Sequence, residues 1–146
     1  MRRALIAAAF VAAALSGSPA ARAQQDPAYA QLDRLVGTWH SPGTFVDSAY
    51  SKAGTADATT ACAWSDGRFY LICQQTVVMN GKTTHGIAIY TYDLDNKKYR
   101  FYNVSVTRAN GTDIVVTPTS ITYAGEFTDE GNHVLTRTLN LWENPQ

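Results

Sequence analysis

The sequence predicts an all-β protein: an antiparallel up-and-down meander of eight strands that curls into a barrel, complete or incomplete, after one short N-terminal helix. Runs rich in threonine, valine, isoleucine and tyrosine follow one another from residue 39 to residue 142, and these residue types favour strands. Short turn signals separate the runs, among them Asp66-Gly67, Asn80-Gly81 and Asn110-Gly111. Both residues of such a pair can adopt the positive φ angles that tight hairpins need, so consecutive strands are expected to pair with each other. Closing the sheet into a barrel removes its two unpaired edges.

Ahead of the strands, residues 1–23 have the pattern of a secretory signal peptide. Arg2 and Arg3 precede an apolar run over residues 4–15, and Ala21-Arg22-Ala23 supplies the small residues of a cleavage site. The run is shorter than the roughly 20 apolar residues that span a membrane. We therefore expect a secreted, periplasmic protein with no membrane insertion after cleavage, in which residues 24–146 form a single domain.

The expected helix covers residues 27–36. Asp26 can accept hydrogen bonds as the N-cap, and Pro27 suits the first helical position. Apolar residues recur at spacings of three and four: Tyr29, Leu32, Leu35 and Val36. Gly37 can end the helix in a left-handed conformation. A helix of this length does not hold its shape alone, so we expect it to pack on an apolar surface.

The strands follow in order, separated by turns. The expected strands are 39–46, 57–64, 68–79, 82–92, 98–108, 112–117, 120–128 and 133–142. Pro42-Gly43 is expected to interrupt the first strand, and the polar stretch 48–55 to form a loop. In the last strand, Leu135, Leu139 and Leu141 alternate with polar residues and share a face with Arg137, a pattern that predicts the barrel interior.

An ordered set of short motifs resembles the bacterial DUF1579 family of secreted lipocalin-like proteins, within the calycin-like barrels. The motifs are Gly37-Thr38-Trp39, Gly67-Arg68-Phe69, His85-Gly86, Tyr92-Asp93 and Lys98-Tyr99. The resemblance covers residues 32–142 and implies an antiparallel barrel with a helix over one end, without a known reaction. It implies that Trp39 fills the narrow end. A late-strand arginine would lie over it, and Arg137 is the candidate for this cation–π contact; alternatively, Arg137 points to water.

Cys62 and Cys73 are the only cysteines. With Ser65 opposite Arg68 across the hairpin, Cys62 faces Leu71, and the two cysteines sit diagonally on one face, near the long limit for a bridge. Export and an even number of cysteines favour a disulfide between them.

Four aromatic residues are expected on adjacent strands around one turn: Tyr90, Tyr92, Tyr99 and Phe101. Aromatic pairs across strands stabilise sheets, which is one interpretation. The other is a pocket mouth that binds an amphipathic ligand by stacking and hydrogen bonding. The sequence thus predicts an exported barrel that binds a small apolar or amphipathic molecule. The alternative is a fully packed structural or partner-binding barrel without a cavity.

Other classes of function have weaker support. The chain lacks a nucleophile elbow, a phosphate loop and a dinucleotide fingerprint, so we expect no catalytic residues. His40, His85 and His133 have no carboxylates at ligand spacing, so we expect no metal and no cofactor. An enzyme, such as an isomerase or hydrolase, and a haem-binding barrel are the distant alternatives. Without Arg2, Arg3 and Arg22, the chain keeps 9 of its 12 Lys and Arg against 12 Asp and Glu. The absence of a basic stripe argues against nucleic acid as a partner.

The sequence given ends at Gln146, directly after the last expected strand. If eight strands leave the barrel incomplete, an outer strand has unpaired backbone groups. Such an edge favours pairing with another chain or aggregation, so we expect a partly open barrel that either forms a homodimer through an open sheet edge or is poorly soluble.

Overall fold

The computed structural model describes residues 26–47, 52–106, 109–129 and 131–142. The expected signal peptide and its cleavage site lie outside these residues. The described elements are α2 (Pro27–Ala30), η1 (Gln31–Leu35), β1 (Gly37–Phe45), β2 (Gly54–Trp64), η2 (Asp66–Arg68), β3 (Leu71–Met79), β4 (Lys82–Asp93), β5 (Lys98–Ser105), β6 (Ala109–Val116), β7 (Ser120–Asp129) and β8 (Asn132–Leu141).

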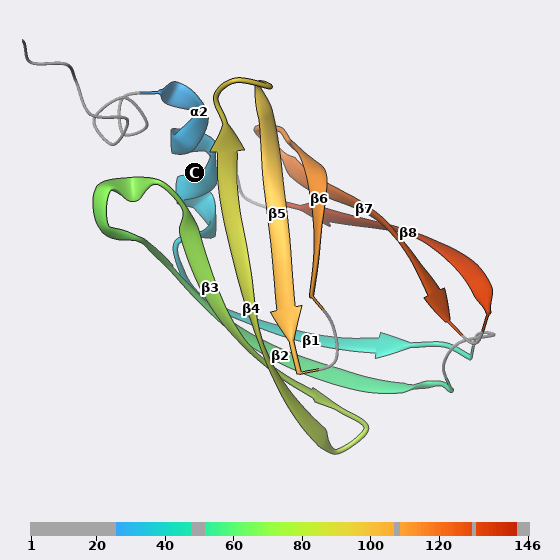
Figure 1. Cartoon of the computed structure of the whole chain (residues 1–146). Helices are drawn as coiled ribbons and strands as arrows, with labels where there is room; N and C mark the ends of the chain where they lie inside the picture. The colour runs from blue at the N-terminus through green and yellow to red at the C-terminus, as the bar shows by residue number, and fades with distance from the viewer. Residues whose placement is uncertain (1–25, 48–51, 107–108, 130, 143–146) are drawn as a thin grey trace, which may run out of the picture.

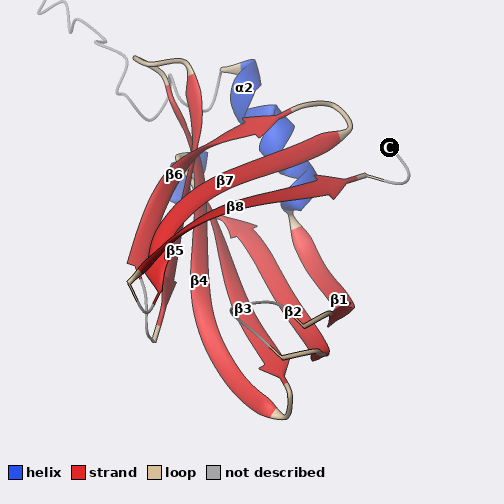
Figure 2. Cartoon of the chain, turned by 90° about the vertical axis from the view of Figure 1, so that its right-hand side faces the viewer, coloured by secondary structure: helices blue, strands red, loops and turns tan. Residues whose placement is uncertain are grey.

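The strands form one antiparallel sheet in the order of the sequence, from β1 to β8, which confirms the predicted meander. The sheet curls into a half-barrel whose outer strands are β1 and β8 (Figures 1 and 2). Each strand pairs with its sequence neighbour because the connections are short. The fold therefore has a concave face, a convex outer face and two sheet edges.

A short helical segment lies at one end of the curled sheet (Figure 2). The Asp26 carboxylate accepts a hydrogen bond of 2.8 Å from the Ala28 amide, as an N-cap should. The predicted helix is present but is not uniform, because its second half is a 3₁₀ helix. Gly37 then has a φ of 119°, which glycine adopts without steric cost, and the chain turns from the helix into β1.

The buried core lies between this helical segment and the strand ends nearest to it. Its members are Leu32, Leu35, Cys62, Leu71, Cys73, Ala88, Tyr90, Ile114 and Ile121. The helix is stable at this length because its apolar side is covered by the sheet rather than by water.

Several strand boundaries differ from the prediction for local reasons. β1 continues through Pro42, which is tolerated because an edge strand has one unpaired side. β2 begins at Gly54 rather than at residue 57. β3 begins at Leu71 rather than at residue 68, because η2 intervenes with positive φ at Gly67 and Arg68.

The prediction of a turn at Asn110-Gly111 is wrong. Both residues lie inside β6, where Asn110 pairs with Asn103 and Gly111 pairs with Tyr102 of β5. A Cβ atom on Gly111 would lie 2.7 Å from the Tyr102 ring. The glycine is therefore needed for the close approach of an aromatic ring across the strands, and not for a hairpin turn.

The face predicted for the last strand is also wrong. Leu135, Leu139 and Leu141 are 73%, 52% and 66% exposed, whereas Val134 is 8% exposed. The register sets this orientation, because Thr138 pairs with the inward Tyr123 of β7. Strand alternation separates two faces but does not say which one the neighbouring strands will cover.

Candidate functional site

The four predicted aromatic residues form two cross-strand pairs. Tyr90 lies opposite Phe101, and Tyr92 lies opposite Tyr99, in the β4–β5 register. The ring centroids are 5.1 Å apart in the first pair and 4.9 Å apart in the second. Directly opposed aromatic residues stabilise an antiparallel pair of strands. The structure therefore brings together all four residues, on the side of the sheet that faces the helical segment.

The outer pair of this group fastens the helix to the sheet. The Tyr99 hydroxyl donates a hydrogen bond of 2.9 Å to the Ala28 carbonyl, and the Tyr29 hydroxyl donates one of 2.8 Å to the Tyr92 carbonyl. Burial, followed by the neighbouring Tyr92, raises the pKa of Tyr99. The hydroxyls of Tyr29 and Tyr99 satisfy backbone carbonyls, and the Tyr92 ring lies 6.1 Å from the Tyr29 ring, so Tyr92 and Tyr99 both serve the packing of the helix.

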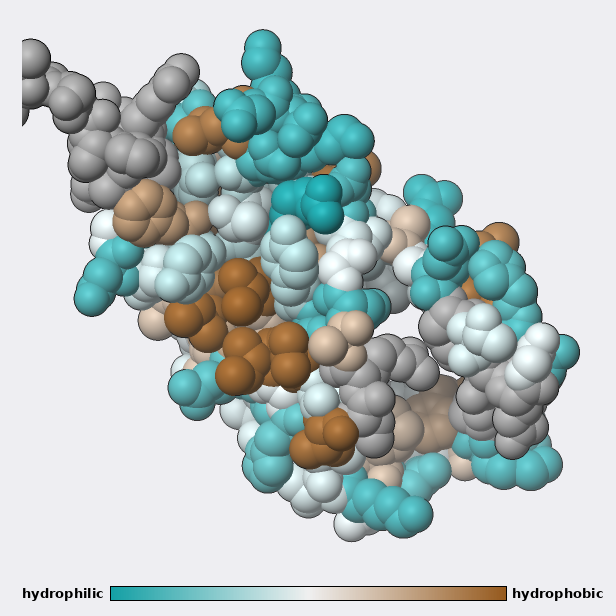
Figure 3. All heavy atoms as spheres, in the orientation of Figure 1, coloured by the Kyte–Doolittle hydropathy of each residue, from teal (hydrophilic) through white to brown (hydrophobic). Residues whose placement is uncertain are grey.

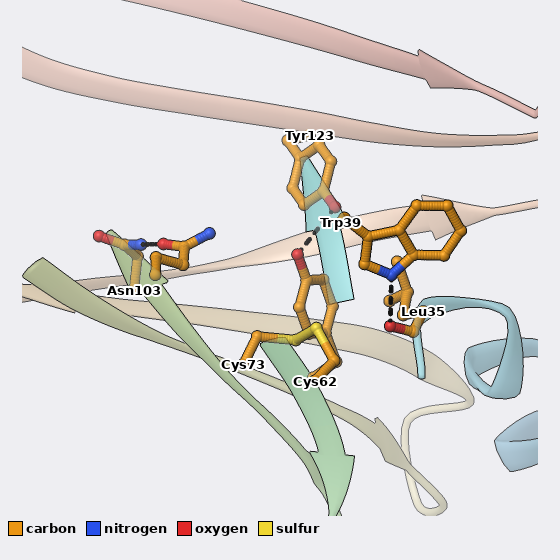
Figure 4. Close-up of a disulfide and its surroundings, with 8 residues drawn as sticks. Leu35, Trp39, Cys62, Cys73, Asn103 and Tyr123 are labelled. Atoms are coloured by element: carbon orange, nitrogen blue, oxygen red, sulfur yellow. Dashed lines mark hydrogen bonds between the residues drawn. A yellow bond between two sulfur atoms is a disulfide. The ribbon is translucent and has the colours of Figure 1, made fainter. Parts of the chain in front are cut away.

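The inner pair, Tyr90 and Phe101, packs against Tyr123 of β7. The Tyr90 and Tyr123 hydroxyl oxygens are 3.0 Å apart, as the dashed line at Tyr123 marks in Figure 4. The Phe101 and Tyr123 rings meet edge to face at 5.0 Å. Burial, followed by the neighbouring Tyr123, raises the pKa of Tyr90 far above its ordinary value. The pKa of Tyr123 is also raised, chiefly by burial. Tyr90, Phe101 and Tyr123 thus form a neutral aromatic wall with a polar tip, which we call the tyrosine wall.

The raised pKa of Tyr90 predicts a loss of stability in alkali. Below pH 10 the hydroxyl is protonated in both states, so its contribution to folding is complete. Above about pH 10 the unfolded chain ionises and the folded chain does not, so the free energy of unfolding falls with increasing pH. We expect Tyr90→Phe to fall less steeply than wild type in urea titrations between about pH 8 and about pH 11. An unchanged slope would contradict the burial of a neutral Tyr90.

Two carboxamides meet on the concave face next to the tyrosine wall. The side-chain amide of Asn103 in β5 donates a hydrogen bond of 3.3 Å to the side-chain oxygen Oε1 of Gln75 in β3 (Figure 4). The bond passes over β4, where Gly86 and Ala88 occupy the facing positions. The small residues of β4 leave room for the two longer side chains to reach each other. Each carboxamide has further donor and acceptor positions beyond this bond.

The sequence alone did not indicate this amide pair. Gln75 and Asn103 lie on strands that are separated by a third strand, and neither is part of a recognisable motif. The signal that could have found them is the alternation of β3, which places a polar Gln75 among the apolar residues of the concave face.

Trp39 occupies a different environment from the one expected. The side chain is 41% exposed, so it does not fill a closed barrel end. Its indole nitrogen donates a hydrogen bond of 2.8 Å to the Leu35 carbonyl, and its ring lies 6.1 Å from that of Trp142. Trp39 follows Gly37 at the start of β1 and Trp142 follows β8, so this contact joins the two outer strands at the helix end. The buried Trp142 indole N–H has no hydrogen-bond partner among the described residues.

The expected cation–π contact of Arg137 with Trp39 is absent. Arg137 is exposed on β8 opposite Ala124, in line with the alternative that it points to water. Within the described part of the chain, Arg68 is the arginine over an indole, with its guanidinium 4.8 Å from the Trp64 ring. Arg68 and the Trp64 indole both donate to the Asp33 carboxylate, the indole at 2.7 Å. This group fixes the helical segment to the β2–β3 hairpin.

The expected disulfide between Cys62 and Cys73 is present, but the register differs from the prediction. The two cysteines face each other directly across β2 and β3, and Leu71 faces Trp64 instead of Cys62. The 3₁₀ turn η2 lengthens the connection and shifts the pairing. The bridge is buried at the base of the concave face, below the tyrosine wall (Figure 4).

Two open cavities lie against the sheet away from the tyrosine wall. One, of about 390 Å³, is lined along β1 to β3 by residues that include Thr38, Ala61 and Ile72. The other, of about 430 Å³, is lined along β3 to β5 by residues that include Ile87 and Val104. Ile87 and Val104 face each other and are 44% and 46% exposed. Apolar side chains gather over the same central strands in Figure 3.

The histidines lie apart on the described strands. His40 contacts Asp57 at 2.8 Å and His133 contacts Glu126 at 3.3 Å, both in exposed positions. His85 contacts the Thr76 hydroxyl at 3.2 Å. Over the described ranges, no three His, Cys, Asp or Glu residues are grouped to hold a metal ion. No helix in these ranges is long and apolar enough to cross a membrane.

Comparison with known proteins identifies a family. A family model described as "Protein of unknown function (DUF1579)" matches residues 24–138. No match was found among curated proteins, and none among solved structures.

Proposed function

The chain belongs to the DUF1579 family, and we propose that it binds a small amphipathic molecule on the open half of its concave face. This open half is the part of the concave face beyond the tyrosine wall, away from the helix. The observation that carries the proposal is the incomplete burial of the inward side chains in this open half. Ala56, Ala58 and Thr60 of β2 alternate inward but are only half-buried, and so are Gln75 and Asn103.

Small side chains line part of this face. The inward positions of β2 are small, and Gly86 interrupts the row of side chains on β4. Large side chains would be expected at these positions if the interior were packed to the density of an ordinary core. A bound molecule would cover apolar surface that the chain itself leaves in contact with water.

The chemistry of this face supports an amphipathic rather than a purely apolar ligand. The tyrosine wall offers ring surface for stacking. The amide pair of Gln75 and Asn103 offers donors and acceptors beside it. A mostly apolar surface with a few placed polar groups is the usual composition of a small-molecule site.

We further propose that the protein acts outside the cytoplasm and that its half-barrel is related to the lipocalin-like barrels. The signal-peptide pattern of residues 1–23 supports export. The disulfide supports it independently, because such bridges persist in oxidising compartments. The Gly37-x-Trp39 opening and the helix at one end of the sheet support the relationship to lipocalin-like barrels.

A second candidate function is the binding of a protein partner on the convex face. The observation that favours it is the exposed apolar surface around Ile87 and Val104 on the central strands, since contiguous apolar surface often marks an interaction site. The concave face remains the better candidate because it combines curvature, ring surface and amides in one place.

Two tryptophan substitutions on β2 distinguish the faces. Ala58 points into the concave face, and its neighbour Thr59 points outward and is exposed. We expect Ala58→Trp to weaken the binding of anilinonaphthalene sulfonate, an amphipathic aromatic probe, by at least about tenfold. Thr59→Trp should leave the dissociation constant within about twofold of wild type. Titration by probe fluorescence measures both, and equal affinities for the two variants would contradict the concave site.

A further inference from the structure

The outermost strand β8 has an unusual combination of features for an exposed edge. It is ten residues long, and within the described residues the ladder of hydrogen bonds ends with it. Its outward side chains include Leu135, Leu139 and Leu141, all more than half exposed. A long edge strand with exposed leucines is a template for pairing with another strand, although Arg137 and His133 also point outward from it.

The opposite edge does not have these features. β1 contains Pro42, which has no N–H to donate, and its outward side chains include Thr38, His40 and Thr44. Proline and polar side chains are the usual means of protecting an edge strand. The two edges of the sheet differ because β1 carries a proline, and β8 is open to association up to Leu141, after which Trp142 contacts Trp39 of β1.

We infer that β8 pairs antiparallel with β8 of a second copy of this chain, about a two-fold axis at Thr138. Antiparallel pairing of the same strand from two copies is an isologous contact, and such a contact closes at two chains. The two copies then form one continuous sheet, with the convex faces on the same side.

The side chains of β8 select the register. Centring on Thr138 places Leu135 opposite Leu141 of the second copy, and Arg137 opposite Leu139. Centring one residue earlier places the two Arg137 side chains directly opposite each other, and like charges in that position destabilise the pair. The register at Thr138 therefore buries the leucines while keeping the two guanidinium groups apart.

Opposite charges at Leu139 test both the contact and its register. Leu139→Lys places an ammonium opposite Arg137 of the second copy, whereas Leu139→Glu places a carboxylate there. We expect wild type to sediment as a dimer. The dissociation constant of the Leu139→Lys dimer should be at least about tenfold higher than that of wild type. Leu139→Glu should remain at least tenfold tighter than Leu139→Lys, because its charge attracts Arg137.

A control on the other edge completes the test. Thr44→Lys on β1 should leave the dissociation constant of the dimer unchanged. Far-ultraviolet circular dichroism should show the same β content for every variant. Analytical ultracentrifugation over a range of protein concentrations measures the association. A monomeric wild type, equal weakening by the two Leu139 variants, or dissociation by Thr44→Lys would each overturn the β8 pairing at this register.

Discussion

Replacing Leu71 by alanine is expected to lower the free energy of unfolding by about 2–5 kcal/mol. Leu71 begins β3, is fully buried, and lies opposite Trp64 on one side and Tyr90 on the other. The substitution leaves a cavity between the disulfide and the tyrosine wall, where the β-sheet backbone cannot collapse to fill it. Urea denaturation of the purified protein measures the change.

Val115→Ala is the control. It also shortens an apolar side chain, but on a strand position of β6 that is 61% exposed and away from the β8 edge, so we expect a change within about 0.5 kcal/mol. If the two variants were equally destabilised, the inner face of the half-barrel would be wrongly assigned.

Removing the disulfide is expected to have the second largest effect. Cys62 and Cys73 are 11 residues apart, and closing a loop of this size in the unfolded chain corresponds to roughly 3 kcal/mol. We expect the double variant Cys62→Ala/Cys73→Ala to lose about this amount relative to oxidised wild type. Alanine is the appropriate replacement because both sites are buried and a serine would introduce a hydroxyl.

Reductant provides the control for this effect. Adding dithiothreitol should lower the denaturation midpoint of wild type and leave that of the double variant unchanged. The account would be wrong if oxidised wild type and the double variant unfolded at the same urea concentration.

The sequence was sufficient to predict the order of the strands, because short turns force neighbours in sequence to pair. The sequence was not sufficient to predict which alternating set of β8 faces inward, since the pattern of Leu135, Leu139 and Leu141 is compatible with either face. Pairing with β7 decides this, and it places Val134 inside. Asn110-Gly111 was misassigned because a glycine under an aromatic ring and a glycine in a turn give the same local signal.

The candidate site was partly accessible from the sequence. The aromatic pairs of β4 and β5 were found because they lie on adjacent strands around one turn. Tyr123 and the bond between Gln75 and Asn103 were not found, because these contacts pass over one or more intervening strands and depend on the curvature of the sheet. The role of Trp39 also depended on the fold, since its partner Trp142 lies at the other edge of the sheet.

Native mass spectrometry of the purified full chain tests the proposed concave site most directly. We expect wild type and Thr59→Trp to carry the mass of a small bound molecule that is lost on denaturation. Ala58→Trp should appear at the mass of the protein alone. The same bound mass on Ala58→Trp, or no bound mass on any of the three proteins, would contradict the proposal.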